Sequence, residues 1–81
     1  IKEQAEQVIS NLESICSAAN ASLSDIVKLN IYLTDLANFA EVNQVMQDRF
    51  SEPYPARATV QVSALPLNVE IEMDAIVYLN E

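Results

Sequence analysis

The sequence has no glycine and no histidine, and it has one cysteine, Cys16. Without histidine, the chain has no imidazole for acid–base catalysis or for binding a metal. A single cysteine excludes a disulfide within the chain, which fits a reducing compartment. Glycine gathers in tight turns and averages roughly 7% of residues. Its absence, together with a first residue other than methionine, predicts that a turn-rich segment lies outside these 81 residues.

Positive charge is also scarce, because 4 lysines and arginines face 12 aspartates and glutamates, for a net charge of −8. Nucleic-acid binding needs clustered cations, but here they are far apart in sequence: Lys2, Lys28, Arg49 and Arg57. We therefore expect no nucleic-acid partner. No apolar run approaches the roughly 20 residues of a membrane span, and no signal peptide is visible. The expected location is the cytoplasm, without membrane contact.

The first 20 residues have the periodicity of an amphipathic helix. Apolar residues recur at spacings of three and four along one face: Ile1, Ala5, Val8, Ile9, Leu12, Ile15, Cys16 and Ala19. The pattern predicts a helix over residues 2–19. Asn20 suits the left-handed position that follows a helix, because asparagine tolerates that conformation better than most residues.

A strand and a second helix are expected next. Residues 26–33 alternate, with one face formed by Val27, Leu29, Ile31 and Leu33. Thr34 and Asp35 are residues that start helices. A helix should run from there to about residue 50, after a short irregular turn. Its expected apolar stripe is Leu36, Phe39, Ala40, Met46 and Phe50.

The last third of the chain predicts two strands. Pro53 and Pro55 make residues 51–56 a loop. Residues 57–64 then alternate, and Pro66 and Asn68 mark a turn before the longest strand, residues 69–79. The order α-β-α-β-β predicts a single two-layer α+β domain over residues 1–81, with residues 26–64 as a crossover between parallel strands. Both helices should cover one sheet face, and another subunit should cover the other face.

Arg57 is the first candidate for a binding residue, because it opens a strand directly after the proline-containing loop. A guanidinium fixed in this way can hold a carboxylate with two hydrogen bonds, and it stays charged at any working pH. The alternative is an ordinary ion pair with Glu70, Glu72 or Asp74.

Three further positions carry polar groups that can do chemistry. Glu70, Glu72 and Asp74 alternate along one strand, so one of them can act as a general base, or the row is a solvated face. Asn43 interrupts the apolar stripe of the second helix, where a buried amide needs a partner in the protein or in a ligand. Thr59 shares the face of Arg57 and can offer a hydroxyl, or it reflects strand propensity alone.

Several strings resemble one known family in the right order along the chain. They are DIVK at 25–28, YLTD at 32–35, FAEVN at 39–43, PARATVQV at 55–62, LP at 65–66 and VEIE at 69–72. Together they are similar to the Rid family, also called YjgF-like or L-PSP endoribonuclease-like. The resemblance covers the whole chain and implies that it is a partial Rid-like domain, lacking the N-terminal strands of that family.

The resemblance implies a chorismate-mutase-like fold, a homotrimer with ligand sites between subunits, and no cofactor or metal. The last strand would then lie beside the first crossover strand, so the last two strands need not form a hairpin. Carried over residue by residue, Arg57 matches the carboxylate-binding arginine and Glu72 the glutamate proposed to position water. Asn43 matches an asparagine near the pocket, and Thr59 stands where many members have cysteine and others threonine.

The implied reaction is hydrolysis of 2-aminoacrylate or another 2-imino acid to a 2-keto acid and ammonia, as in a 2-iminobutanoate/2-iminopropanoate deaminase. Two alternatives stay open. The chain can belong to a trimer that binds keto acids without turnover, for which the same arginine would serve. Ribonuclease activity, attributed to some relatives, fits a net charge of −8 less well.

Overall fold

In the computed structural model, which describes residues 1–79, the amphipathic first segment forms helix α1 (Lys2–Ala18). The helix ends as predicted, with Asn20 in the left-handed conformation at φ 61°. Two hydrogen bonds close the last turn: the Asn20 N–H donates to the Ser17 carbonyl and the Ala21 N–H to the Cys16 carbonyl. Ala5, Ile9 and Cys16 are buried, whereas Ile15 is 67% exposed and so lies outside the predicted stripe.

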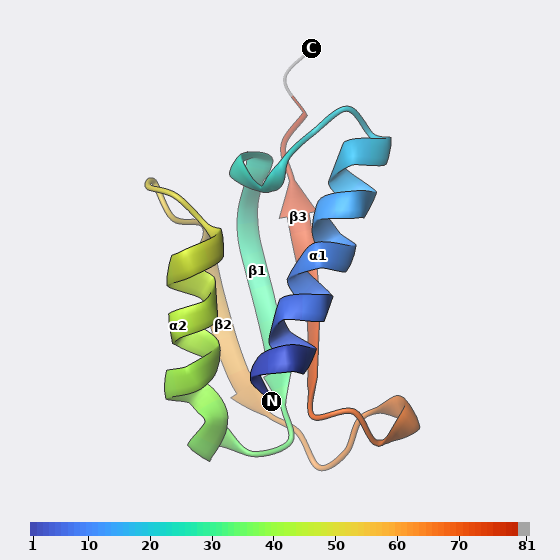
Figure 1. The fold of residues 1–81 in the computed structure, drawn as a ribbon, viewed down its shortest axis with the longest axis vertical. Coiled ribbons are helices and arrows are strands. Elements are labelled where there is room, and N and C mark those ends of the chain that lie inside the picture. Colours follow the sequence, from blue (N-terminus) through green and yellow to red (C-terminus); the bar gives the residue numbers. More distant parts are fainter. Residues whose placement is uncertain (80–81) are drawn as a thin grey trace.

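The sheet has three strands in the order β2-β1-β3, with β1 (Ile26–Leu33) at its centre (Figure 1). β2 (Ala56–Gln61) runs parallel to β1, and β3 (Ile71–Val77) runs antiparallel to it. The predicted parallel pair is therefore present. The last two strands lie on opposite sides of β1 and form no hairpin with each other.

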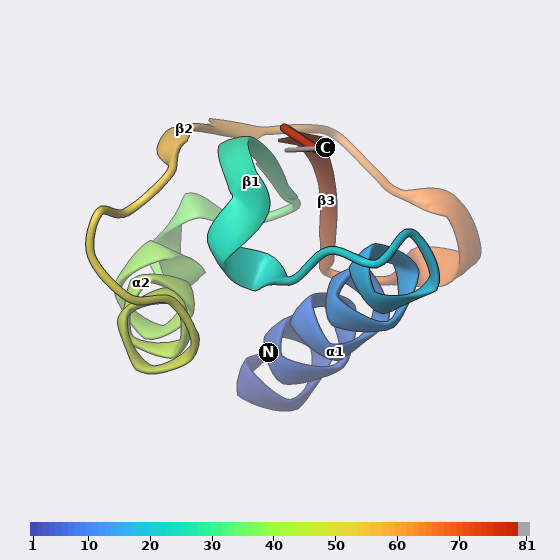
Figure 2. The same cartoon turned by 90° about the horizontal axis from the view of Figure 1, so that it is seen from above.

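Both helices pack on the same face of the sheet, as the sequence predicts (Figure 2). The two layers enclose one apolar core: Ala5, Ile9, Cys16, Leu23, Ile26, Leu29, Ile31, Leu33, Val42, Val45, Met46, Phe50, Ile71 and Met73. No other element covers the opposite sheet face within residues 1–79 (Figure 2). We call this uncovered side the open face; it carries residues 28, 30 and 32 of β1 and their partners in β2 and β3.

A bulge at the start of β1 corrects one prediction. The pairing register with β3 shifts between Ile26 and Lys28, which leaves Val27 as an extra residue. Ile26 consequently enters the core, and Val27 is 50% exposed instead of sharing the face of Leu29. Period-two reasoning cannot place such a residue, because one extra position reverses the faces of everything before it.

The second helix follows a short irregular turn, as predicted, but its apolar stripe differs from the prediction. Residues Leu36–Asn38 form a 3-10 turn, and α2 (Phe39–Arg49) follows it. The predicted stripe is right at Met46 and Phe50 but wrong at Leu36, Phe39 and Ala40, which are exposed. The tighter turn rotates the first residues away from the core, and Val42 and Val45 complete the buried face instead.

The two outer strands are shorter than expected, spanning residues 56–61 and 71–77 instead of 57–64 and 69–79. The predicted turn between them is present as a 3-10 turn, Pro66–Asn68, with Leu67 and Asn68 at positive φ. Glu70 lies before β3, and its N–H donates to the Gln4 side chain of α1 at 2.8 Å. It therefore does not belong to the same strand row as Glu72 and Asp74.

Candidate functional site

Arg57 lies on the face of β2 that points toward the helices. Its partner in the parallel register is Leu29, which is fully buried under the helices, so both side chains project to that side of the sheet. The Arg57 guanidinium carbon lies 5.4 Å from the centre of the Phe39 ring, at the start of α2. Within residues 1–79, Arg57 forms no ion pair with Glu70, Glu72, Asp74 or any other acid. The alternative of an ordinary ion pair is therefore not what these residues show.

A pocket of about 140 Å³ lies beside this guanidinium, between α2 and the loop that leads into β2. Its lining comprises Asn43, Met46, Gln47, Phe50, Tyr54, Pro55 and Arg57. Asn43 is half-buried, so its amide can hydrogen-bond a ligand from inside the pocket. The structure thus brings two of the predicted site residues, Arg57 and Asn43, to one cavity. A cation and an amide above apolar walls suit a small organic anion.

Thr59 lies two residues farther along the same face of β2, paired with Ile31. Its hydroxyl oxygen is buried and has no hydrogen-bond partner among residues 1–79. A buried hydroxyl without a partner is unfavourable by about 1–3 kcal/mol, so such groups normally meet water or a ligand. Thr59 is not part of the pocket lining, but it follows Arg57 as the next residue on the same face of β2.

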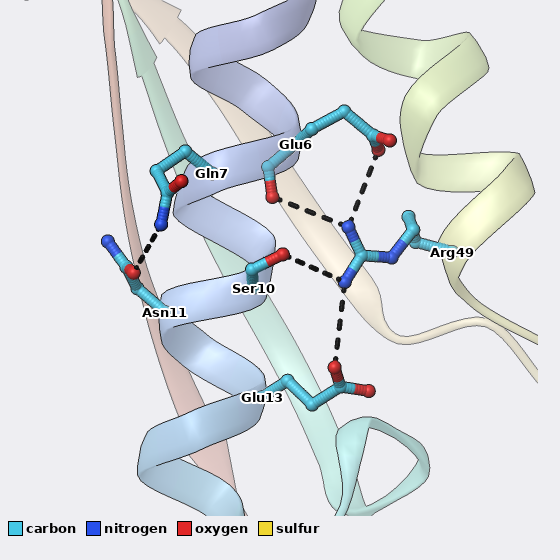
Figure 3. A network of polar contacts seen from close by, with 6 residues as sticks. All are labelled: Glu6, Gln7, Ser10, Asn11, Glu13 and Arg49. Carbon is cyan, nitrogen blue, oxygen red and sulfur yellow. Dashed lines mark hydrogen bonds and ion pairs between the residues drawn. The ribbon is translucent and has the colours of Figure 1, made fainter.

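Arg49 differs from Arg57, because its guanidinium is bonded to side chains and a carbonyl of α1 (Figure 3). It reaches from the last turn of α2 to α1 and donates to the Glu6 carbonyl at 3.3 Å and to the Ser10 hydroxyl at 3.3 Å. Its guanidinium also lies 3.5 Å from a Glu6 carboxylate oxygen and 3.7 Å from one of Glu13. Arg49 is thereby committed to joining the two helices, whereas Arg57 is not committed to an acid.

Glu72 lies on the other side of the sheet from Arg57. It pairs with Tyr32 of β1, and its exposed side chain belongs to the open face. The pocket beside Arg57 does not include it. Within one chain, therefore, the structure does not bring these two residues together.

Asp74, the next acid on the open face, is held by two donors. Asn30 donates its amide to one carboxylate oxygen at 2.7 Å, and the Tyr32 hydroxyl donates to the other at 2.8 Å. These two bonds, with the charge of Lys28, lower the pKa of Asp74 despite slight desolvation. The hydrogen bond from Tyr32 to Asp74 is also the main cause that raises the pKa of the Tyr32 hydroxyl. Desolvation and the charges of Asp74 and Glu72 add to this shift. Asp74 is thus an ionised, structurally engaged acid.

Sequence reasoning missed the roles of Phe39 and Tyr54. The helical spacing predicts a core position for Phe39, yet its side chain is 37% exposed and its ring faces the guanidinium of Arg57. Tyr54 stands in the proline loop and lines the pocket. No spacing pattern signals either role, because both depend on how α2 and the loop meet β2 in space.

Cys16 is buried as predicted, and burial is the main cause that raises the pKa of its thiol, with the charges of Asp25 and Glu13 adding to it.

The described part of the chain contains neither a cluster of metal ligands nor a helix that could span a membrane. Among residues 1–79, no three histidine, cysteine, aspartate or glutamate side chains are grouped so that they could hold a metal ion. Over the same residues, neither helix is long and apolar enough to cross a membrane.

The sequence pattern of one protein family, described as Endoribonuclease L-PSP, matches residues 1–79 of this chain. A RutC family protein of Pyrococcus abyssi is 51% identical over 78 residues, which are 96% of this chain and 61% of that protein. A 2-iminobutanoate/2-iminopropanoate deaminase of Dermatophagoides farinae is 38% identical over 79 residues, which are 98% of this chain and 62% of that protein. The chain thus spans about three-fifths of the length of these relatives.

Solved structures agree with this similarity. RidA of the Antarctic bacterium Psychrobacter sp. PAMC 21119 superposes with a TM-score of 0.96 at 53% identity, covering 98% of this chain and 64% of that one. E. coli TdcF with bound serine superposes with a TM-score of 0.93 at 38% identity, covering 98% and 65%. The fold is therefore the chorismate-mutase-like fold of these proteins. The chain belongs to the endoribonuclease L-PSP family, the Rid or YjgF-like family that its motifs resemble.

Proposed function

We propose that the intact protein hydrolyses 2-aminoacrylate and related 2-imino acids to 2-keto acids and ammonia, with Arg57 holding the substrate carboxylate. The observation that carries the proposal is the placement of Arg57: a charged guanidinium beside a pocket, without an ion pair to any acid of residues 1–79. A permanent cation in this setting is ready for an external anion. Asn43, in the same pocket, supplies an amide for the polar end of the ligand.

The relatives support this class of ligand. One is named 2-iminobutanoate/2-iminopropanoate deaminase and another, from Arabidopsis thaliana, Reactive Intermediate Deaminase A. TdcF of E. coli was crystallised with serine, which carries a carboxylate like that of an imino acid. Because this chain spans only part of their length, the activity of the whole protein is a proposal that rests on the pocket as well as on these names.

Hydrolysis of 2-aminoacrylate requires few catalytic groups from the protein. 2-Aminoacrylate tautomerises to 2-iminopropanoate, water adds to the imine carbon, and loss of ammonia from the adduct leaves pyruvate. The substrate is already reactive, so holding it and presenting water accounts for the rate. Arg57 would hold the carboxylate, and Glu72 would take a proton from the attacking water. Thr59, with its unpartnered buried hydroxyl, would hydrogen-bond the ligand or its water.

Glu72 can join this site only from a second copy of the chain, because Glu72 and Arg57 of one chain are on opposite sheet faces. We therefore propose a homotrimer in which the open face is covered by a neighbouring copy. This face carries Val60 and Ile76, about half exposed, beside the acids of β3. Exposed apolar side chains on an uncovered sheet favour such an interface.

One observation favours a second candidate, a trimer that binds keto acids without turnover. Each chain carries the anion-binding arginine without the glutamate that would manage water. If no neighbouring copy brings Glu72 to the pocket, binding remains and catalysis is lost. Ribonuclease activity ranks last, despite the description of the family, because a chain of net charge −8 repels the phosphate backbone.

The test is ammonia and keto-acid release by the intact protein when a threonine dehydratase generates the enamine from serine or threonine. Wild type should accelerate release over the uncatalysed rate, and Arg57→Ala and Glu72→Gln should abolish the acceleration. Lys2→Ala removes an exposed cation on α1, a helix that contributes no residue to the pocket lining, and controls for net charge. Binding of 2-ketobutyrate without any acceleration would select the binding module, and equal rates for wild type and Arg57→Ala would refute the role of Arg57.

A further inference from the structure

Phe39 is an aromatic residue that the core does not use. It begins α2 with 37% of its surface exposed, and it is not among the buried residues that α2 contributes to the core. The guanidinium carbon of Arg57 lies 5.4 Å from the centre of its ring. At that distance the ring attracts the cation electrostatically, and no acid of residues 1–79 forms an ion pair with the guanidinium.

The segment that carries Phe39 is itself held by β2. The Leu36 N–H donates to the Gln61 side-chain oxygen at 2.9 Å, and the Ala37 N–H donates to Asp35 at 2.9 Å. These bonds fix the 3-10 turn at residues 36–38, which leads directly into Phe39. A glutamine of the strand is therefore bonded to the turn that directly precedes the aromatic residue.

Gln61 and Arg57 are on one face of the same strand, four residues apart. Gln61 pairs with Leu33 and Arg57 with Leu29, so both side chains project toward α2. The contacts therefore form a closed circuit. It runs from Arg57 along β2 to Gln61, through the hydrogen bond to Leu36, along the turn to Phe39, and back to the guanidinium. A long, flexible side chain is thereby restrained at both its base and its tip.

We propose that Phe39 and Gln61 are positioning residues for Arg57, which keep its guanidinium directed for carboxylate binding before the ligand arrives. The inference rests on the proposed function for the identity of the ligand. A side chain ordered in advance loses less freedom on binding. Ordering one such side chain costs about 0.5–1.5 kcal/mol, which corresponds to roughly 2- to 10-fold in the dissociation constant.

The experiment is a set of 2-ketobutyrate titrations by calorimetry on the intact protein. Phe39→Leu keeps an apolar side chain and removes the ring face, and it should weaken binding 2- to 10-fold. Phe39→Tyr keeps the ring face and should bind within about 2-fold of wild type. Gln61→Ala should weaken binding like Phe39→Leu. Gln44→Ala changes an exposed glutamine of α2 that donates to Asp48, and it should not weaken binding.

The double variant Phe39→Leu/Arg57→Ala separates positioning from general damage to the fold. If Phe39 acts through Arg57, the double variant binds no more weakly than Arg57→Ala alone. Losses that simply add, or a Phe39→Leu variant that binds like wild type while Arg57→Ala is impaired, overturn the inference and leave the proposed function intact. An Arg57→Ala protein that binds 2-ketobutyrate as wild type does overturns the proposed function itself.

A spectroscopic readout tests the contact without a ligand. In a ¹H–¹⁵N spectrum, the Arg57 Nε–H proton should be displaced by the Phe39 ring current in wild type and in Phe39→Tyr. It should move toward the position of a free arginine in Phe39→Leu. A proton that does not move in Phe39→Leu contradicts the positioning role, whatever the titrations give.

Discussion

The guanidinium of Arg57 lies over the ring of Phe39, 5.4 Å from its centre, and meets no acid of residues 1–79 in an ion pair. The other arginine, Arg49, lies between two glutamates of α1. In a chain with three times as many acids as bases, an arginine facing an aromatic ring and a pocket is a local exception. We therefore expect an anion site at Arg57 on an otherwise acidic molecule.

The two isoleucines of α1 should differ in their effect on stability. Ile9 is fully buried, whereas Ile15 is 67% exposed. We expect Ile9→Ala to lower the free energy of unfolding by about 2–5 kcal/mol, because it removes buried apolar surface and leaves a cavity. Ile15→Ala should change it by less than about 0.5 kcal/mol. Urea unfolding measures both, and equal losses would contradict the placement of Ile15.

Arg49 should matter for stability and not for binding. Its bonds to the Glu6 carbonyl and the Ser10 hydroxyl join α2 to α1 at a partly buried position. We expect Arg49→Ala to lower the free energy of unfolding by about 1–2 kcal/mol, measured by urea unfolding with Lys2→Ala as the exposed control. An unchanged unfolding midpoint would show that the network contributes nothing.

The pKa of Asp74 should depend on Tyr32. The hydrogen bonds from Asn30 and Tyr32 lower this pKa, so Tyr32→Phe should raise it toward its ordinary value. Tyr78→Phe changes an exposed tyrosine in the same way and should leave it unchanged. A ¹³C NMR titration of the Asp74 carboxylate measures the shift, and the same pKa in wild type and Tyr32→Phe would contradict the account.

The sign of the pH dependence follows from the two shifts. Because the folded pKa of Asp74 is lowered, its contribution to stability is present above the ordinary aspartate pKa of about 3.9 and is lost as pH falls through the folded value. The folded pKa of Tyr32 is raised. Its contribution is therefore present below the ordinary tyrosine pKa of about 10 and is lost as pH rises through the folded value.

The order of elements and the two-layer arrangement were predictable because strong periodic patterns encode them. The helix end at Asn20 and the parallel pairing of β1 with β2 follow from local chemistry and from chain length. The bulge at Val27 and the exposure of Leu36 and Phe39 at the start of the second helix were not predictable, because neither has a compositional signal.

Only part of the candidate site was predictable, because Phe39 and Tyr54 lie beside the predicted residues without any signal in the sequence. Arg57 and Asn43 lie in one pocket. The sequence singles out Arg57 as a cation after a proline loop and Asn43 as an amide in an apolar stripe. Alternation alone shows that Arg57 and Glu72 each face one side of a strand, but it cannot say whether those are the same side. Pairing with Leu29 and Tyr32 of β1 decides that they are opposite.

The most direct test of the central claim is the affinity of the intact protein for 2-ketobutyrate, compared between wild type and Arg57→Ala, with Lys2→Ala as the matched loss of one positive charge. If Arg57 grips the carboxylate, Arg57→Ala should bind roughly 10- to 100-fold more weakly, the equivalent of about 1.5–3 kcal/mol for hydrogen bonds to a charged group. Lys2→Ala should bind like wild type. Equal affinities for wild type and Arg57→Ala would contradict the account.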